Sequence, residues 1–269
     1  YIREAVESGK ISGNGLFTQK CQQFFRERYG FRKTLLTTSC TDALEMAAIL
    51  ADVGPGDEVI VPSFTFVSTA LAFVRQGAKI VFADSQPDHP NLDLDQAEAL
   101  ITPRTKALVV VHYAGVACDM DRAMALAEKH GLVVVEDAAQ AIDATYKGRP
   151  LGGIGHLGWF SFHETKNVIS GEGGALIVNE ERFVRRSEII WEKGTNRAEF
   201  FRGEVNKYGW VDVGSSFLPS EIVAAFLYAQ LERLDAIQAK RQALWDAYAQ
   251  GLAELAGQGR ITLPGLPAY

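Results

Sequence analysis

The hydrophobic residues of the first half of the chain form short apolar runs that alternate with stretches of helical spacing. Strands are predicted at Thr34–Thr38, Glu58–Val61, Lys79–Ala83, Ala107–Val111 and Leu132–Glu136, and helices between them at Asp42–Leu50, Ser68–Gln76, Leu94–Ile101 and Met120–His130. Strand, helix and strand in repetition is typical of an α/β domain with a largely parallel, helix-covered sheet. The run from Leu132 to Val135 is apolar without alternation, as expected of a strand that is buried on both faces.

The pattern changes after residue 157. Two further strands are predicted at 158–162 and 175–178, separated by a polar and glycine-rich stretch. A single long helix is expected to begin near Pro219-Ser220 and to run past Leu244. Its apolar stripe has helical spacing and consists of Val223, Leu227, Leu231 and Leu234.

Composition narrows the class of protein. The chain has 269 residues, of which 47% are hydrophobic, enough for one large domain or for one domain and part of another. A net charge of −6 argues against a nucleic-acid partner, which usually requires a basic face. No apolar run is long enough for a membrane span and no signal peptide is evident, so we expect a cytoplasmic protein without a membrane partner. The three cysteines lack metal-ligand spacing, and we expect no metal site.

Candidate chemistry is sought beyond the carboxyl ends of the strands, where open α/β sheets bind ligands. The first candidate is Ser39 with Asp42, which has the S-x-x-D spacing of a helix start. Free amides and the positive end of the helix dipole make such a start a phosphate site, although an ordinary capped helix gives the same pattern. The second candidate is the pair Phe64 and Phe66 after a strand, which suits either stacking on a flat heterocycle or the core.

The third candidate is the carboxylate pair Glu136 and Asp137 at the end of the apolar strand. Burying a charge is costly unless it is paired, so two carboxylates here are unexpected. We expect one of them to face solvent or a surface partner, and Asp137 at the strand tip to point toward the ligand crevice. There it would suit a protonated pyridine nitrogen. The alternative is that Asp137 caps a short helix.

The fourth candidate is Lys166, which lies between two predicted strands and close to Gly171, Gly173 and Gly174. A lysine becomes a nucleophile where its environment lowers its pKa, whereas a lone lysine is as well explained by a solvated surface. The four candidates together supply a phosphate anchor, a ring stack, a pyridinium partner and an imine-forming amine. These are the requirements of pyridoxal 5′-phosphate (PLP).

The stretch Ser161-Phe162-His163-Glu164-Thr165-Lys166-Asn167, followed by Gly171-Glu172-Gly173-Gly174, resembles the lysine motif of the DegT–StrS family of sugar-nucleotide aminotransferases. Segments 13–18, 62–69 and 135–140 match that family in order and spacing. The resemblance covers nearly the whole chain. It implies the three-layer α/β large domain of a fold-type-I PLP aminotransferase over residues 1–235, with a mostly parallel sheet. Residues 236–269 would form a connecting helix and the beginning of a small C-terminal domain, cut short by the end of the chain.

The resemblance also implies roles around the cofactor ring. Lys166 would be the imine lysine and the proton carrier, and Asp137 would pair with the pyridine nitrogen. Gln140 would hydrogen-bond the ring hydroxyl, and Phe66 would stack on the ring.

At the phosphate, the resemblance implies backbone donors at Thr41 and Asp42 together with the hydroxyl of Ser161. Many relatives also place an asparagine of the neighbouring subunit there, in a homodimer with active sites at the interface. Ser216 occupies the asparagine position in this chain, and its side chain reaches less far.

The likeness is strongest to one branch, the dTDP-4-amino-4,6-dideoxygalactose transaminases of surface-polysaccharide synthesis, through segments 111–116, 193–197 and 214–220. That branch aminates dTDP-4-keto-6-deoxyglucose at C4 with L-glutamate as donor. Two alternatives stay open: a sugar 3-aminotransferase of the same family, and a non-catalytic nucleotide-sugar-binding α/β module. A basic loop with Lys193, Arg197 and Arg202 is a candidate pyrophosphate contact or a solvated surface.

Overall fold

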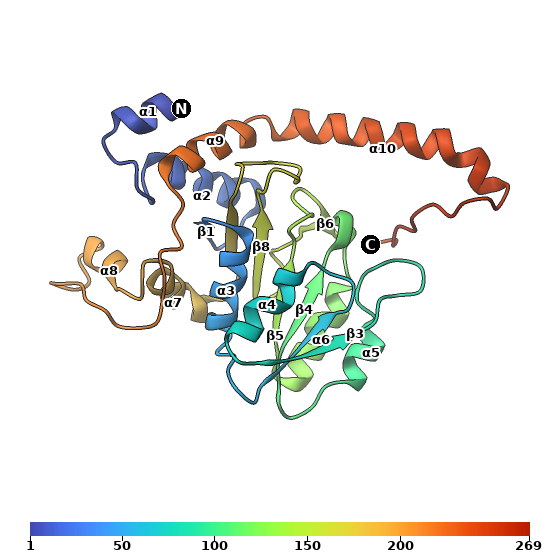
Figure 1. Cartoon of the computed structure of the whole chain (residues 1–269), viewed down its shortest axis with the longest axis horizontal. Helices are drawn as coiled ribbons and strands as arrows, with labels where there is room; N and C mark the ends of the chain where they lie inside the picture. Colours follow the sequence, from blue (N-terminus) through green and yellow to red (C-terminus); the bar gives the residue numbers. More distant parts are fainter.

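A seven-stranded sheet forms the centre of the molecule, and the computed structural model describes every residue from Tyr1 to Tyr269 (Figure 1). Its strand order is β1-β9-β8-β5-β4-β2-β3. The strands are β1 (Lys33–Thr37), β2 (Glu58–Pro62), β3 (Lys79–Ala83), β4 (Thr105–Val111), β5 (Val133–Asp137), β8 (Leu157–Ser161) and β9 (Gly174–Val178). Only β9 is antiparallel to its neighbours, so the expected mostly parallel sheet is confirmed.

Helices cover both faces of the sheet and make three layers. One apolar core lies under α3 (Cys40–Leu50), α4 (Val67–Arg75) and α7 (Glu181–Trp191). The opposite core lies under α2 (Leu16–Tyr29), α5 (Leu94–Ala99), α6 (Met120–His130) and α9 (Glu221–Leu231). The remaining elements are peripheral: α1 (Ile2–Glu7), η1 (Tyr113–Gly115), β6 (Thr145–Tyr146), β7 (Arg149–Pro150), α8 (Arg197–Phe201) and α10 (Leu234–Gly257).

The predicted single helix after Ser220 is wrong, because the chain forms two helices there. Helix α9 ends at Leu231, and Arg233 leaves helical geometry at φ −104° and ψ 5° before α10 begins. Leu227, Leu231 and Leu234 are nevertheless all buried in the same core. The apolar stripe continues across the break, so its spacing is that of one uninterrupted helix.

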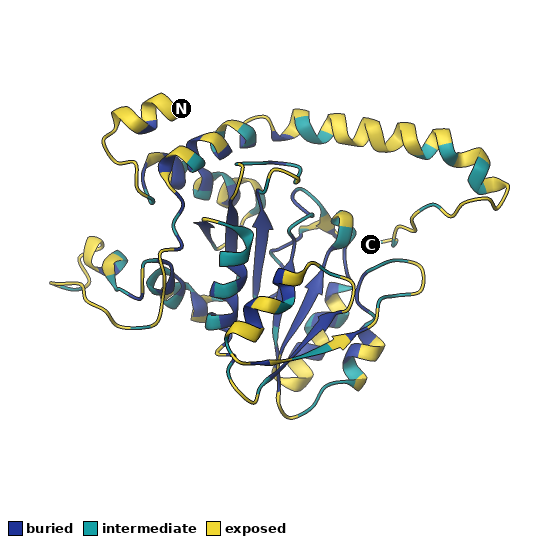
Figure 2. Cartoon of the chain, in the orientation of Figure 1, coloured by how far each residue is buried: buried dark blue, intermediate teal, exposed yellow.

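Helix α10 extends away from the body of the molecule and is exposed along most of its length (Figures 1 and 2). Leu234 is its one buried residue. The expected domain boundary at 235/236 falls at the start of this helix and stays a prediction. No helix of the chain is long and apolar enough to cross a membrane.

The strand register decides which side chains share a face. Asp137 pairs with Trp159 across parallel strands β5 and β8, and Ser161 lies two residues further along β8. Because side chains alternate along a strand, Asp137 and Ser161 point to the same face, the one covered by α3 and α4. Glu136 points to the other face.

Candidate active site

The start of α3 forms one end of the candidate site. Ser39 has extended backbone geometry, and its hydroxyl accepts a hydrogen bond of 3.1 Å from the amide of Asp42. The predicted capped helix start is therefore confirmed. The hydroxyl of Thr41 lies 3.0 Å from that of Ser68 at the beginning of α4. The first turn of α3 thus points its dipole and amides into the site end of the sheet.

Strand β9 approaches this helix start unusually closely. A Cβ atom at Gly174 would lie 2.6 Å from the carbonyl oxygen of Ser39 and 2.7 Å from the Cα atom of Cys40. Both contacts are with backbone, which leaves room for glycine alone. Gly174 also pairs with Thr37 on one side and with Ser161 on the other, which brings the Ser161 hydroxyl to the start of α3.

The thiol of Cys40 lies where the expected site residues converge. Burial raises its pKa and the charge of Asp137 raises it further, whereas the charge of Lys166 and a hydrogen bond with Ser161 lower it. These influences act at short range. The structure therefore brings Asp137, Ser161 and Lys166 together around the first turn of α3, as expected.

Asp137 carries a buried carboxylate whose partners are neutral. Thr69 Oγ1 donates to Oδ2 at 2.8 Å, and the amide of Ala139 donates to Oδ1 at 3.1 Å. Asp137 is 6% exposed and forms no ion pair with a cation of the chain. The alternative that Asp137 caps a short helix is wrong, because residues 138–144 form turns and no helix. The carboxylate also has no counterion within the chain. This environment fits a ligand that brings its own cationic ring nitrogen.

Glu136 corrects the expectation that one carboxylate of the pair faces solvent or a surface partner. Its side chain is fully buried, and it accepts hydrogen bonds from the amides of Gly152 at 2.8 Å and Ile154 at 2.6 Å and from that of Gly155. The imidazole of His112 contacts it at 3.0 Å. Glu136 is therefore stabilised inside the protein, on the face of the sheet away from Asp137.

Lys166 lies in the loop after β8, in a tight turn in which its amide donates to the carbonyl of His163 at 2.9 Å. It is half-buried, and its ammonium group forms no ion pair within the chain. His163 itself contacts the hydroxyl of Thr165 at 2.9 Å. The lysine thus has a free amine at the site, and it is not part of a charged helical surface.

The remaining expected residues lie at the rim. Phe66 is the N-cap of α4 and is 72% exposed, and the amide oxygen of Gln140 accepts from the Ala114 amide at 2.8 Å. Ser216 is exposed and its hydroxyl forms no hydrogen bond within the chain, but the next residue, Phe217, accepts from the Thr38 amide at 3.0 Å. No hydrogen bond within the chain joins the Ser216 side chain to the other expected site residues.

Of the three basic residues of the loop at Lys193, Arg197 and Arg202, one is neutralised by carboxylates. Arg202 forms ion pairs with Glu188 and Glu204, and Arg197 lies 5.3 Å from the ring centroid of Phe201. For Arg202 to contact a pyrophosphate, its ion pairs with Glu188 and Glu204 would have to break.

Two site residues were not expected from the sequence. Thr69 donates to Asp137 and is in turn 2.8 Å from Thr65 Oγ1, and Cys40 lies between the phosphate end and the lysine. The signal for the threonines was their i, i+4 spacing at a helix start. For Cys40 no pattern distinguishes it from a core residue.

The arrangement fits PLP: a helix start with free amides, a buried carboxylate without a counterion and a free lysine amine share one face of the sheet. Comparison with known families is consistent with this fit. Residues 1–267 match the model of the DegT/DnrJ/EryC1/StrS aminotransferase family.

The chain belongs to this family. The family is PLP-dependent, and the expectations of a sugar aminotransferase and of PLP as its cofactor are confirmed.

Two curated relatives support the assignment. GDP-perosamine synthase of Caulobacter vibrioides is 36% identical over 98% of this chain and 69% of its own length. The spore coat polysaccharide biosynthesis protein SpsC of Bacillus subtilis is 38% identical over 95% of this chain and 66% of its own. The chain therefore spans about two thirds of the length of the curated relatives it matches.

Solved structures share the fold. An aminotransferase from Psychrobacter cryohalolentis superposes with a TM-score of 0.92 at 33% identity, covering 98% of this chain and 68% of the other. The protein Spr1654 of Streptococcus pneumoniae, solved in PLP and PMP forms, superposes on this chain with a TM-score of 0.85 at 29% identity, covering 94% of this chain and 68% of its PLP form. The expected fold-type-I large domain is confirmed by these neighbours.

Proposed function

We propose that this chain transfers the amino group of L-glutamate to a nucleotide-linked keto-sugar. The observation that carries the proposal is the Asp137 carboxylate, buried without a counterion and held by Thr69 and the Ala139 amide on the face of the sheet that Lys166 and Ser161 share. When bound there, PLP supplies an electron sink for the carbon that exchanges the amino group.

The first turn of α3 holds the phosphate in this proposal. The amides of Thr41 and Asp42 and the hydroxyl of Ser161 donate to the phosphate oxygens, and the helix dipole favours their negative charge. The absence of a side chain at Gly174 lets β9 and β8 bring Ser161 within reach.

Phe66 and the sheet would hold the ring between them. Asp137 would keep the ring nitrogen protonated, because an opposite charge at contact distance raises the pKa of that nitrogen. Gln140 binds the ring hydroxyl, with its amide oriented by the contact to Ala114. Phe66 is exposed in the chain and gains a partner when it covers the ring.

Lys166 performs the proton transfer. With PLP bound, its amine would hold the cofactor to the protein. Nζ, as a free amine, would accept the proton from the α-carbon of the amino donor and return a proton to the acceptor sugar. The Lys166 side chain forms no ion pair with a carboxylate of the chain, so it is free to move between these partners.

For the sugar, we propose dTDP-4-keto-6-deoxyglucose, aminated at C4 to give dTDP-4-amino-4,6-dideoxygalactose. The support is the likeness of segments 111–116, 193–197 and 214–220 to that branch. A relative named GDP-perosamine synthase makes GDP the competing nucleotide. We also propose a homodimer in which Ser216 meets the phosphate bound by its partner, since Ser216 is exposed in its own chain.

Reduction of the PLP-treated protein with borohydride, followed by peptide mass spectrometry, tests the cofactor assignment. We expect the added mass on the peptide that contains Lys166, and loss of the visible absorption in Lys166→Met. The matched control is Lys207→Met, an exposed lysine. A colourless protein with unmodified Lys166 would overturn the proposed function.

The substrate is tested separately with L-glutamate and a panel of dTDP-, GDP- and UDP-linked 4-keto and 3-keto sugars. We expect amination of the dTDP-linked 4-keto sugar. Turnover only with a 3-keto sugar would identify a 3-aminotransferase, and turnover only with a GDP-sugar would replace the nucleotide.

A further inference from the structure

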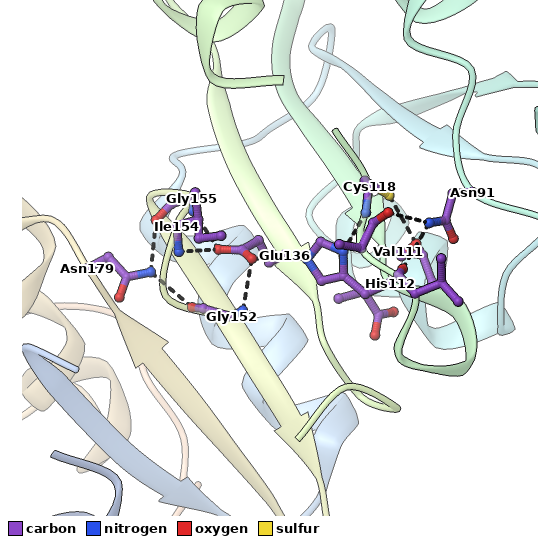
Figure 3. A network of polar contacts seen from close by, with 12 residues as sticks. Asn91, Val111, His112, Cys118, Glu136, Gly152, Ile154, Gly155 and Asn179 are labelled. Atoms are coloured by element: carbon purple, nitrogen blue, oxygen red, sulfur yellow. Dashed lines mark hydrogen bonds and ion pairs between the residues drawn. The ribbon is translucent and has the colours of Figure 1, made fainter. Parts of the chain in front are cut away.

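Behind the candidate site, on the opposite face of the sheet, the carboxylate of Glu136 is surrounded by hydrogen-bond donors (Figure 3). The amides of Gly152, Ile154 and Gly155 donate to it from one side. The Nε2 atom of His112 approaches it from the other at 3.0 Å. A buried carboxylate has about four acceptor positions, so this one is fully satisfied.

The hydrogen bonds of His112 determine where its ring proton lies. The amide of Cys118 donates to Nδ1 at 3.1 Å, so Nδ1 is an acceptor. The proton is therefore on Nε2 and is donated to Glu136. The main-chain amide of His112 also donates to the carbonyl of Asp137 at 3.0 Å. His112 thus contacts both carboxylate-bearing residues of β5, one through its ring and one through its backbone.

Two loops are fastened to this pair (Figure 3). Asn91 Nδ2 donates to the carbonyls of Val116 and Ala117 at 2.9 and 3.0 Å, which fixes the loop after His112. In the other loop, the side chain of Asn179 donates to the carbonyls of Gly152 and Gly155 at 3.0 and 2.8 Å.

Each loop leads to a group that faces the candidate site. The loop after His112 carries Ala114, whose amide holds the side chain of Gln140. The loop at 152–155 continues directly into β8, which carries Ser161. The network on the rear face is therefore connected to the expected ring and phosphate contacts on the front face.

We propose that Glu136 and His112 are positioning residues for the cofactor: from the rear of the sheet they fix the direction in which Asp137 and Gln140 meet the ring. Adjacent residues on a strand point to opposite faces, so a rigidly held Glu136 sets the rotation of Asp137. Four charge-assisted contacts hold the Glu136 carboxylate in one position, because moving it would leave a buried charge without hydrogen bonds. The inference rests on the proposed function, since it concerns the same site.

The structure suggests a pair of variants that separate the two hydrogen bonds of His112. A glutamine amide reaches the position of Nε2, so His112→Gln keeps the donor to Glu136. An asparagine amide reaches only the position of Nδ1, so His112→Asn keeps the acceptor for Cys118 but loses that donor. Glu136→Gln removes the charge itself. Glu58→Gln is the matched control, because Glu58 is also a buried, hydrogen-bonded carboxylate but lies at the opposite end of the strands.

Three quantities are measured: PLP affinity of the cofactor-free protein by absorbance titration, its melting temperature, and the pH at which the visible absorption of bound PLP changes. We expect His112→Asn and Glu136→Gln to bind PLP about tenfold more weakly, as for a lost hydrogen bond to a charged group. We expect their visible pH transition to move by about one unit. His112→Gln restores both, whereas Glu58→Gln lowers the melting temperature alone.

The outcomes distinguish a network that positions the site from one that only stabilises the fold. Unchanged PLP affinity and an unchanged pH transition in His112→Asn and Glu136→Gln, with only a lower melting temperature, would show that the pair supports the fold and does not position the site. Equal effects in Glu58→Gln would also overturn the inference. If the unaltered protein takes up no PLP, the proposed function fails first, and the positioning role falls with it.

Discussion

Among single residues, Asp137 makes the sharpest demand on a ligand. Its carboxylate is 6% exposed, accepts hydrogen bonds from a threonine and an amide, and has no counterion in the chain. Such a group is stable only where its hydrogen bonds are good or a cation joins it. The ring nitrogen that we propose to bind there would supply the counterion that Asp137 lacks.

We expect Asp137→Asn to keep PLP attached to Lys166 but to slow transamination by about 10- to 1,000-fold. An opposite charge at this distance shifts a pKa by about 1 to 3 units, so the protonated fraction of the ring nitrogen falls by that factor. Single-turnover rates with L-glutamate measure the effect. Thr69→Val is the companion variant, with a loss of about tenfold from the missing donor. An unchanged rate in Asp137→Asn would contradict the assigned role.

The sequence singles out Asp137 because a carboxylate at the end of an apolar strand is conspicuous, and Lys166 because it lies between two predicted strands beside glycines; their roles stay predictions. It did not identify the burial of Glu136. Alternation places Glu136 and Asp137 on opposite faces, but three of the four partners of Glu136 are backbone amides 16 to 19 positions later in the chain. Main-chain donors leave no mark on a residue pattern, so only the fold reveals them.

At the scale of elements, the contact between β9 and α3 depends on Gly174. An alanine there would bring its Cβ within 2.6 Å of backbone that cannot rotate away. Strand and helix would have to separate at the point where the phosphate is proposed to bind. The stability of this junction and cofactor affinity are therefore linked.

We expect Gly174→Ala to lower the free energy of unfolding by about 1 to 3 kcal/mol, as for overpacked sites, and to weaken PLP binding. Urea denaturation and PLP titration provide the two measurements. Gly251→Ala is a suitable control, since a Cβ there meets nothing and lies in the exposed helix α10. It should leave PLP binding unchanged and stabilise the helix by up to about 1 kcal/mol. Equal stability of Gly174→Ala and the unaltered protein would show that β9 and α3 can move apart at no cost in free energy.

The amino end of β2 gives a pH-dependent prediction. Glu58 accepts from Thr102 Oγ1 at 2.6 Å and from Arg104 at 2.9 Å, and these bonds lower its pKa from 4.5 to about 2. A depressed carboxylate pKa contributes stability above the unfolded value and loses it as the pH falls. The stability difference between the unaltered protein and Glu58→Gln should be complete near neutral pH. It should shrink as the pH falls from 4.5 toward about 2, as followed by denaturation at a series of pH values. A difference that is independent of pH would refute this.

The boundaries of the helices and strands show how accurately the hydrophobic pattern of the sequence predicts them. The limits of β3 and α6 were predicted to the residue, because each is a clear run bounded by turn residues or by a cap. The division between α9 and α10 was missed, since Leu231 and Leu234 pack into one core on either side of it. Helix α2 was also missed, and its cap is a glycine, Gly15, whose amide donates to distant Glu221.

At the scale of the whole molecule, several large apolar side chains lie on the surface. Trp210 is 83% exposed, Phe66 72% and Phe201 71%. Trp210 and Phe201 belong to one segment of the chain around α8, and apolar side chains that gather on a surface mark interaction sites. Their exposure agrees with the proposed homodimer, in which Trp210 and Phe201 would be covered, whereas Phe66 would be covered by the cofactor ring.

We expect sedimentation to give the mass of two chains, with Trp210→Ser shifting the equilibrium toward single chains because it removes apolar area from the interface. Tyr248→Ser, at an exposed position of α10, is the comparison variant. A mass of one chain at every concentration would exclude the homodimer and leave Ser216 without a phosphate to meet.

The opposed carboxylates of β5 have a consequence for how this chain finds a single fold. Val133, Val134 and Val135 are identical, and the strand is buried on both faces, so apolar packing alone would accept β5 displaced by one position. Such a displacement would turn Glu136 toward α3 and Asp137 toward His112, and would leave the amides of the 152–155 loop without their acceptor. The displaced register is disfavoured, because burying a carboxylate away from its hydrogen-bond donors costs free energy. The two acidic residues therefore fix the register of the central strand. The sheet adopts the register in which Asp137 faces the site.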